Sequence, residues 1–172
     1  MTPTHAVRVV VYEDLQCPDC AVYQKMLDDQ LLPRYGGAVA FEHRDFPLPK
    51  HAAARPAALA ARYFAQVIPD LGLAFRRHCF ARLRQVSFLE NMENIVREFA
   101  HASSADGDKA LAALHNPALA KLVDSDYQEG LARGVVRTPT VFVNEHPFVE
   151  HFTFEEISKS IDAALAAFPQ PK

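Results

Sequence analysis

Two cysteines separated by two residues stand where an apolar segment gives way to a helix. The stretch "EDLQCPDC" (13–20) follows the β-branched run "AVRVVVY" (6–12), which predicts a buried strand. Pro18 is typical of a first helical turn, so we expect Cys17 at the start of a helix and Cys20 one turn inside it. The chain must therefore fold so that a strand leads a pair of thiols into a helix N-terminus.

This position predicts a redox-active pair. Thiolates attack in disulfide exchange, and a helix start stabilises negative charge on Cys17, which leaves Cys20 to resolve a mixed disulfide. A zinc site and two inert core thiols are the alternatives, but zinc commonly takes four ligands and only Cys79 and scattered histidines remain. Cys79 shares a helical stripe with apolar residues and is interpreted as a buried core residue, a third redox thiol being the alternative.

The rest of the chain divides into a β-α-β unit, a helical stretch and a β-β-α unit. The first unit has a helix from 18 to about 32, ended by Pro33 and Gly36–Gly37, and a strand at 38–46, which implies parallel pairing of its strands. In the helical stretch we expect helices at 51–67, 71–83 and 91–100, the last with a Ser87–Glu90 capping box, and a short helix after Asp106. A longer helix is expected from Asn116–Pro117 to Gly134. The last unit has expected strands at 138–144 and 147–151, joined at Glu145–His146, and a final helix that begins with a capping box of Thr153 and Glu156.

Length and charge narrow the classes of function. A chain of 172 residues fits one domain, and a net charge of -3 gives no reason to expect nucleic acid. No apolar run is long enough for a membrane span. The N-terminus lacks a signal-peptide pattern, so we expect a cytoplasmic protein, or a periplasmic or other extracytoplasmic one if a signal was removed.

Three motifs resemble the DsbA-like branch of the thioredoxin superfamily: "VVVYEDLQCPDC" (9–20), "HRDFPLPKHAAARPAALAA" (43–61) and "RTPTVFVNEHPF" (137–148). The resemblance implies an α/β thioredoxin fold, a four-stranded mixed sheet flanked by helices, with an inserted all-helical subdomain. It implies one domain over 1–172, with a thioredoxin core at 1–50 and 116–172 and the helical insertion at 51–115. It also implies a thiol–disulfide oxidoreductase that exchanges disulfides with protein substrates through Cys17-Pro18-Asp19-Cys20.

The resemblance further implies a cis bond between Thr138 and Pro139, packed against the cysteine pair and shaping a groove for an extended substrate peptide. By pattern alone Pro139 is a turn proline at a strand start, for which trans is the default. No metal or organic cofactor is implied, because the Cys17–Cys20 disulfide is the redox centre. The expected partners are protein or peptide thiols and disulfides and a redox partner that recycles the pair, with no nucleic acid and no membrane span.

Some residues depart from the family pattern. Val11 stands where thioredoxin-like proteins often carry a buried acid. Glu13 is two residues on, on the same face of an ideal strand, but is expected beyond the strand's end. Asn144–Glu145 replaces the Asn-Gly of the family's hairpin. His43 is interpreted as part of a charged strand end, and His51 as a helix-start residue rather than a base.

Asp19 bears on the direction of electron flow. Strongly oxidising relatives carry histidine at this position, whereas the negative charge of Asp19 repels a nearby thiolate. We therefore expect a Cys17 pKa above the roughly 3.5 of such relatives and a less oxidising couple. Two alternative functions remain: a non-catalytic peptide-binding or chaperone module on the same fold, and a glutathione-linked thiol transferase or isomerase.

Overall fold

The computed structural model describes residues 7–168 and contains one four-stranded mixed sheet. The strands are β1 (Val7–Glu13), β2 (Val39–Asp45), β3 (Thr140–Val143) and β4 (His146–Val149), in the order β2-β1-β3-β4. β1 pairs in parallel with β2 and antiparallel with β3, and β3 pairs antiparallel with β4. The sequence prediction of a four-stranded mixed sheet with a parallel first pair is confirmed.

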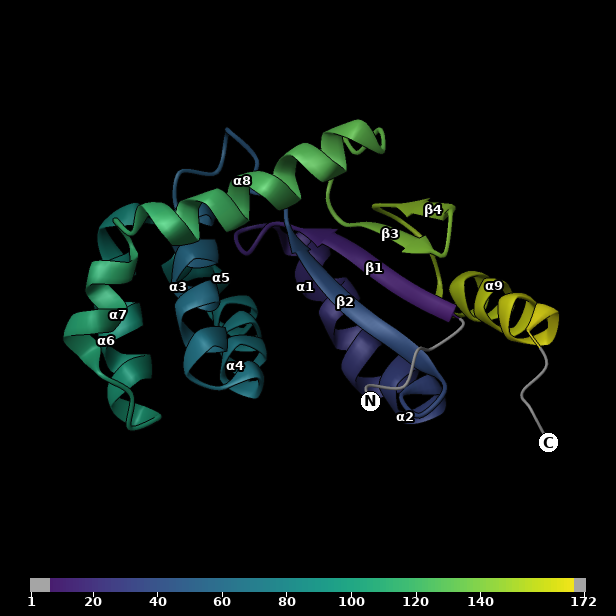
Figure 1. Cartoon of the computed structure of the whole chain (residues 1–172), viewed down its shortest axis with the longest axis horizontal. Helices are drawn as coiled ribbons and strands as arrows, with labels where there is room; N and C mark the ends of the chain where they lie inside the picture. Colours follow the sequence, from purple (N-terminus) through teal and green to yellow (C-terminus); the bar gives the residue numbers. More distant parts are fainter. Residues whose placement is uncertain (1–6, 169–172) are drawn as a thin grey trace.

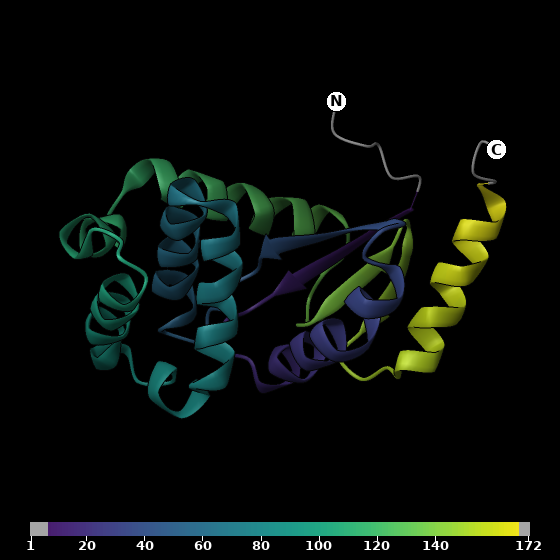
Figure 2. The same cartoon turned by 90° about the horizontal axis from the view of Figure 1, so that it is seen from below.

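Helices cover both faces of this sheet (Figures 1 and 2). On one face, α1 (Pro18–Met26), α2 (Leu32–Tyr35) and α9 (Phe154–Ala167) pack against inward-pointing valines of β1 and β3. On the other face, the long helix α8 (Pro117–Ala132) lies over Tyr12, Phe46 and Phe142. Alternation along β1 explains the two layers, because Val9 and Val11 point to one side and Val10 and Tyr12 to the other.

The segment between β2 and α8 is helical and gathers at one end of the sheet (Figure 1). Its helices are α3 (Ala54–Val67), α4 (Pro69–Ala81), α5 (Leu83–Val86), α6 (Met92–Ala102) and α7 (Gly107–Ala113), with a 3₁₀ turn at Leu89–Asn91. Their apolar faces enclose a cluster in which Phe64, Phe75 and Phe99 contact one another. Cys17 and Cys20 belong to the same cluster, so these helices form one wall of the cysteine site.

Pro33 does not end the first helix, contrary to the sequence prediction. A π-helical turn at Leu27–Leu31 follows α1, in which the Leu32 N–H donates to the Leu27 carbonyl. Pro33 then falls in the first turn of α2, where a residue without an N–H is tolerated. Gly36 closes α2 as expected.

The predicted capping box of Ser87 and Glu90 is also absent. The Ser87 hydroxyl donates to the Leu83 carbonyl instead, and α6 begins only at Met92 after the 3₁₀ turn. Three element boundaries differ slightly from the sequence prediction. Helix α3 begins at Ala54 rather than at residue 51, and α4 begins at Pro69 rather than at residue 71. The turn between β3 and β4 is Asn144–Glu145 rather than Glu145–His146.

The remaining helix signals are confirmed. The side chains of Asp106 and Asn116 accept backbone N–H groups at the starts of α7 and α8, and Thr153 with Glu156 forms a capping box at α9. Gly134, just past α8, has φ +80. Within residues 7–168 no helix is both long enough and apolar enough to cross a membrane.

Candidate active site

Cys17 and Cys20 occupy the two positions expected for an attacking and a resolving thiol. Cys17 is the N-cap residue of α1 with extended backbone angles, and Pro18 fills the first helical position. Cys20 lies one turn inside, fully buried, whereas Cys17 is 6% exposed. Each sulfur has a backbone partner, because the Asp14 N–H lies 3.5 Å from Cys20 Sγ and Cys17 Sγ lies 3.4 Å from the Thr138 carbonyl oxygen.

The pKa values of the two thiols move in opposite directions. A hydrogen bond from Cys20 is the largest cause that lowers the pKa of Cys17 to about 6, and it outweighs the effect of burial. Backbone N–H groups at the start of α1, those of Cys20 and Asp19, lower the same pKa further. Burial, together with Cys17, raises the pKa of Cys20 well above that of an ordinary thiol. At neutral pH the pair therefore carries its negative charge on Cys17, the less deeply buried of the two sulfurs.

The bond between Thr138 and Pro139 is cis, as the family resemblance implied. The backbone carbonyl groups on either side of this bond accept hydrogen bonds from different kinds of donor. Thr140 Oγ1 donates to the Arg137 carbonyl and the Glu150 N–H donates to the Pro139 carbonyl, whereas the Thr138 carbonyl accepts from the Cys17 thiol. Once Cys17 loses its proton, the Thr138 carbonyl no longer has that donor.

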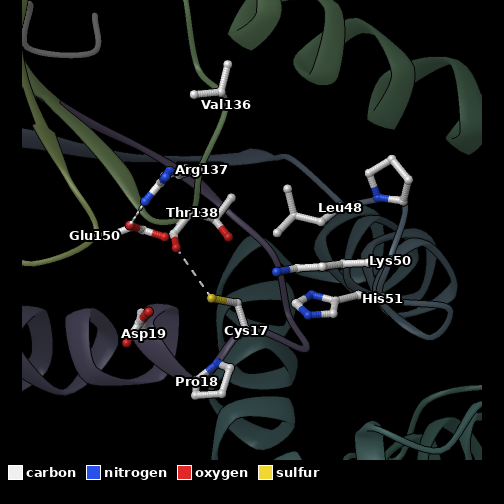
Figure 3. A pocket seen from close by; sticks show the side chains of 11 residues that line it. Cys17, Pro18, Asp19, Leu48, Lys50, His51, Val136, Arg137, Thr138 and Glu150 are labelled. Atoms are coloured by element: carbon white, nitrogen blue, oxygen red, sulfur yellow. Dashed lines mark hydrogen bonds and ion pairs between the residues drawn. The ribbon is translucent and has the colours of Figure 1, made fainter.

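A cavity of about 640 Å³ opens beside Cys17 (Figure 3). Its walls come from the start of α1, from the loop between β2 and α3, and from the loops that flank the β3–β4 hairpin. Lys50 and His51 reach into it from the loop before α3, and Arg137 and Glu150 form an ion pair of 2.9 Å on the opposite side. The cavity thus places the Cys17 sulfur between charged and apolar walls.

Glu13 supplies a buried acid close to the pair, because it lies within the strand and not beyond the strand's end as expected. It is the last residue of β1 and is 1% exposed. Its Oε1 accepts from Arg76 Nη1 at 3.0 Å and lies 2.8 Å from His43 Nδ1. Burial alone would raise the Glu13 pKa, but His43 and Arg76 lower it below its usual value. Val11 is instead an apolar core residue.

Arg76 is the residue of this cluster that sequence reasoning missed. Its Nη2 donates to Asp45 Oδ1 at 2.6 Å, so one guanidinium joins the carboxylates at the ends of β1 and β2. Arg62 also donates to Asp45, at 2.5 Å. One signal was present in the sequence, because Arg76 stands three residues before Cys79 on the apolar stripe of α4.

Asp14 connects the cysteine loop to the loop before α3. Its carboxylate is buried and accepts from the Gln16 N–H and the Leu48 N–H, each at 2.7 Å. The same carboxylate lies 2.9 Å from His51 Nδ1. His51 therefore is not a helix-start residue, since α3 begins three residues later, and it lines the cavity instead.

Cys79 is fully buried, and burial raises its pKa to about 12. This agrees with its interpretation as a core residue. Among residues 7–168 no three histidine, cysteine or acidic side chains are placed to hold a metal ion.

Comparisons with known proteins agree with this geometry. The thioredoxin family model matches residues 3–163. BdbD from Bacillus subtilis superposes with a TM-score of 0.85 at 21% identity, covering 96% of this chain and 90% of that one. The α-DsbA1 of Wolbachia pipientis superposes with a TM-score of 0.79 at 16% identity, covering 97% of this chain and 92% of that one. DsbA2 of Pseudomonas aeruginosa superposes with a TM-score of 0.78 at 17% identity, covering 96% of this chain and 92% of that one. No curated protein matches the chain in sequence. These structural likenesses establish a DsbA-like fold with an inserted group of helices.

Proposed function

Because the chain belongs to the thioredoxin family, with a DsbA-like fold, we propose that it is a thiol–disulfide oxidoreductase acting on protein or peptide substrates. Cys17 exchanges with the substrate and Cys20 resolves. The opposite pKa shifts of these two thiols carry the proposal, because an inert core pair has no reason to hold one sulfur ionised at neutral pH.

In the oxidising direction a substrate thiolate attacks Cys17 Sγ of the Cys17–Cys20 disulfide. A sulfur–sulfur bond forms to the substrate, the bond to Cys20 breaks, and Cys20 leaves with the electron pair and takes up a proton. A second substrate thiolate then attacks the substrate sulfur and expels Cys17. The substrate loses two electrons and the pair gains them. The low pKa of Cys17 makes it the better leaving group in the second step.

The Thr138–Pro139 segment holds the substrate beside this chemistry. In the reduced thiol form the Thr138 carbonyl accepts from Cys17 Sγ. In a mixed disulfide Cys17 has no proton to donate, so this carbonyl is released to accept an N–H from an extended substrate backbone. The cavity of about 640 Å³ next to Cys17 receives the substrate side chains that flank its cysteine.

Insulin reduction by dithiothreitol tests the activity. We expect the full-length protein to accelerate precipitation of the insulin B chain and Cys17→Ser to abolish this acceleration. Cys79→Ser is the matched control, because this thiol is buried away from solvent, and it should retain the wild-type rate. No acceleration by the wild type, together with a Cys17→Ser protein that still suppresses aggregation of an unfolded client, would favour the peptide-binding module instead.

The reduction potential of the Cys17–Cys20 couple sets the direction in which the pair exchanges electrons with other thiols and disulfides. Asp19 lies at the cavity beside Cys17, and the Cys17 pKa of about 6 exceeds the roughly 3.5 of the most oxidising relative. We therefore propose a couple between the roughly -270 mV of thioredoxin and the roughly -120 mV of DsbA. A titration in glutathione buffers measures it directly, and a value at either end of this range contradicts the proposal.

A further inference from the structure

The carboxylate of Asp14 and the imidazole of His51 form a pair at the wall of the cavity beside Cys17. Asp14 is 1% exposed and His51 is partly buried, and Asp14 Oδ2 lies 2.9 Å from His51 Nδ1. Figure 3 shows the His51 ring directed into the cavity on the side of Cys17. The two residues lie 37 positions apart, so only the fold brings them together.

Asp14 fixes the tautomer of this imidazole. Burial raises the Asp14 pKa above its ordinary value, and hydrogen bonds from the Leu48 N–H, the Gln16 N–H and His51 only partly oppose this. The two backbone groups can act only as donors. An acceptor that already takes two backbone N–H groups favours a third donor, so His51 Nδ1 carries the proton. In the neutral imidazole His51 Nε2 is then an acceptor, and within residues 7–168 no side chain or backbone group hydrogen-bonds to it.

One step of the proposed reaction needs a base, and an acceptor such as His51 Nε2 is suited to that role. Cys17 needs no base, because its pKa is already about 6. The incoming substrate thiol does need one, because an ordinary cysteine with a pKa near 8.5 is only about 3% ionised at pH 7. A base that ionised every bound thiol would therefore accelerate the first attack by up to about 30-fold at pH 7.

We propose that His51, oriented by Asp14, is the general base that accepts the proton of the incoming substrate thiol, and this inference rests on the proposed function. The substrate S–H proton passes to His51 Nε2, and the electron pair left on sulfur forms the bond to Cys17 Sγ. The Cys17–Cys20 bond breaks, Cys20 takes a proton from solvent, and His51 releases its own proton to solvent through the open cavity. His51 is thus a catalytic residue, and Asp14 a positioning residue.

The other charged groups at the cavity come from three elements. Lys50 precedes His51 on the same loop, Asp19 lies on α1, and Arg137 and Glu150 flank the β3–β4 hairpin. In the oxidised protein Cys17 has no proton to titrate. Lys50, Asp19, Arg137 and Glu150 are unchanged in a His51 variant, so a ratio of wild-type to variant rate constants removes their contributions, and a variant that still donates to Asp14 keeps that carboxylate paired.

The test is reduction of the oxidised full-length protein by a short peptide with one cysteine between about pH 6 and pH 9.5, stopped with acid and read by mass spectrometry after thiol labelling. His51→Asn is the informative variant, since its amide can still donate to Asp14 in place of Nδ1 but offers no nitrogen base to the cavity. We expect the wild-type rate constant to exceed that of the variant by 10- to 30-fold near pH 7. The ratio should fall towards one above pH 9, where the thiol ionises by itself.

Controls separate this role from a structural one. His101→Asn makes the same substitution on an exposed face of α6, away from the cavity, and should leave the rate at every pH unchanged. His51→Gln serves as the second variant if His51→Asn has a lowered melting temperature.

A ratio of wild-type to His51→Asn rate constants that is the same at every pH would make His51 a structural residue, and a ratio of one throughout would remove it from the reaction. Either result overturns the inference while a fast wild-type reaction sustains the proposed function. A wild type that reacts no faster than oxidised glutathione overturns both.

Discussion

Arg76→Met removes the cation that joins the buried ends of β1 and β2. Arg76 is nearly enclosed, with a side chain 7% exposed, and donates to Glu13 and Asp45, whose side chains are 0% and 1% exposed. Methionine fills much of the same volume without charge. Breaking a buried ion pair by removing one partner costs about 3–5 kcal/mol, because the remaining carboxylates lose their counter-charge in a poorly solvated site. In a chain of this length that corresponds to a fall in melting temperature of about 10 °C.

Arg77→Met is the matched control on the same helix. The Arg77 side chain is 42% exposed and pairs with Asp28, which is 30% exposed, so solvent screens the pair. The free energy of unfolding should fall by only about 0–1 kcal/mol. The two adjacent substitutions remove the same side chain, and the two sites differ in burial and in the number of carboxylate partners.

The pH dependence of the free energy of unfolding gives a sharper test of the role of Arg76. In the wild type the pKa values of Glu13 and Asp45 are lowered, so both carboxylates contribute stability that is present above their unfolded values of 4.5 and 3.8 and is lost as the pH falls through the folded values. Arg76→Met raises both folded pKa values. The free energy of unfolding of the variant should therefore fall furthest below that of the wild type near pH 7. This deficit should shrink as the pH falls to about 4.

Urea unfolding of wild type and both variants at about pH 7 and pH 4 measures these differences in the free energy of unfolding. A deficit for Arg76→Met no larger than that for Arg77→Met would refute the argument from burial. A deficit that grows at the lower pH would refute the assignment of Glu13 and Asp45 as ionised partners.

Three further predictions concern the active site and the packing of the sheet. Iodoacetamide at about pH 6 should label Cys17 before Cys20, because the pKa of Cys17 is about 6, and peptide mapping that finds Cys20 labelled first would reverse their roles. Asp19→His should lower the Cys17 pKa and make the couple more oxidising by on the order of 30–60 mV in glutathione-buffered titrations; an equal or more reducing variant would show that Asp19 does not tune the site. Gly130→Ala should lower the free energy of unfolding by about 1–3 kcal/mol, since its new Cβ would lie 2.7 Å from the Phe46 ring, and a denaturation curve identical to wild type would contradict this.

Local signals determined most of the secondary structure from the sequence. The helix caps at Asp106, Asn116 and Thr153 depend on contacts within three residues, and the cysteine pair at the start of α1 depends on Pro18 and the preceding strand. Alternation in the first strand likewise indicated a buried element. The family resemblance supplied the four-stranded mixed sheet and the cis bond before Pro139, neither of which periodicity alone can give, and only the structure gave the strand order β2-β1-β3-β4.

The errors arose where two local preferences competed. Pro33 normally ends a helix, but a π-helical turn moved it to a first-turn position. Ser87 has the spacing of a helix cap, yet its hydroxyl bonds back to the Leu83 carbonyl four residues earlier.

The chemistry around the cysteine pair was decided by tertiary structure. The sequence alone placed Cys17 and Cys20 at a helix start, because that arrangement is local. It could not pair Glu13 with Arg76, 63 residues away, or Asp14 with His51, 37 residues away. Charged residues are mostly exposed, so a sequence pattern assigns them to the surface by default. Only the folded chain shows which of them lose contact with water, and burial with a partner is what shifts their pKa values and orients their side chains towards the site.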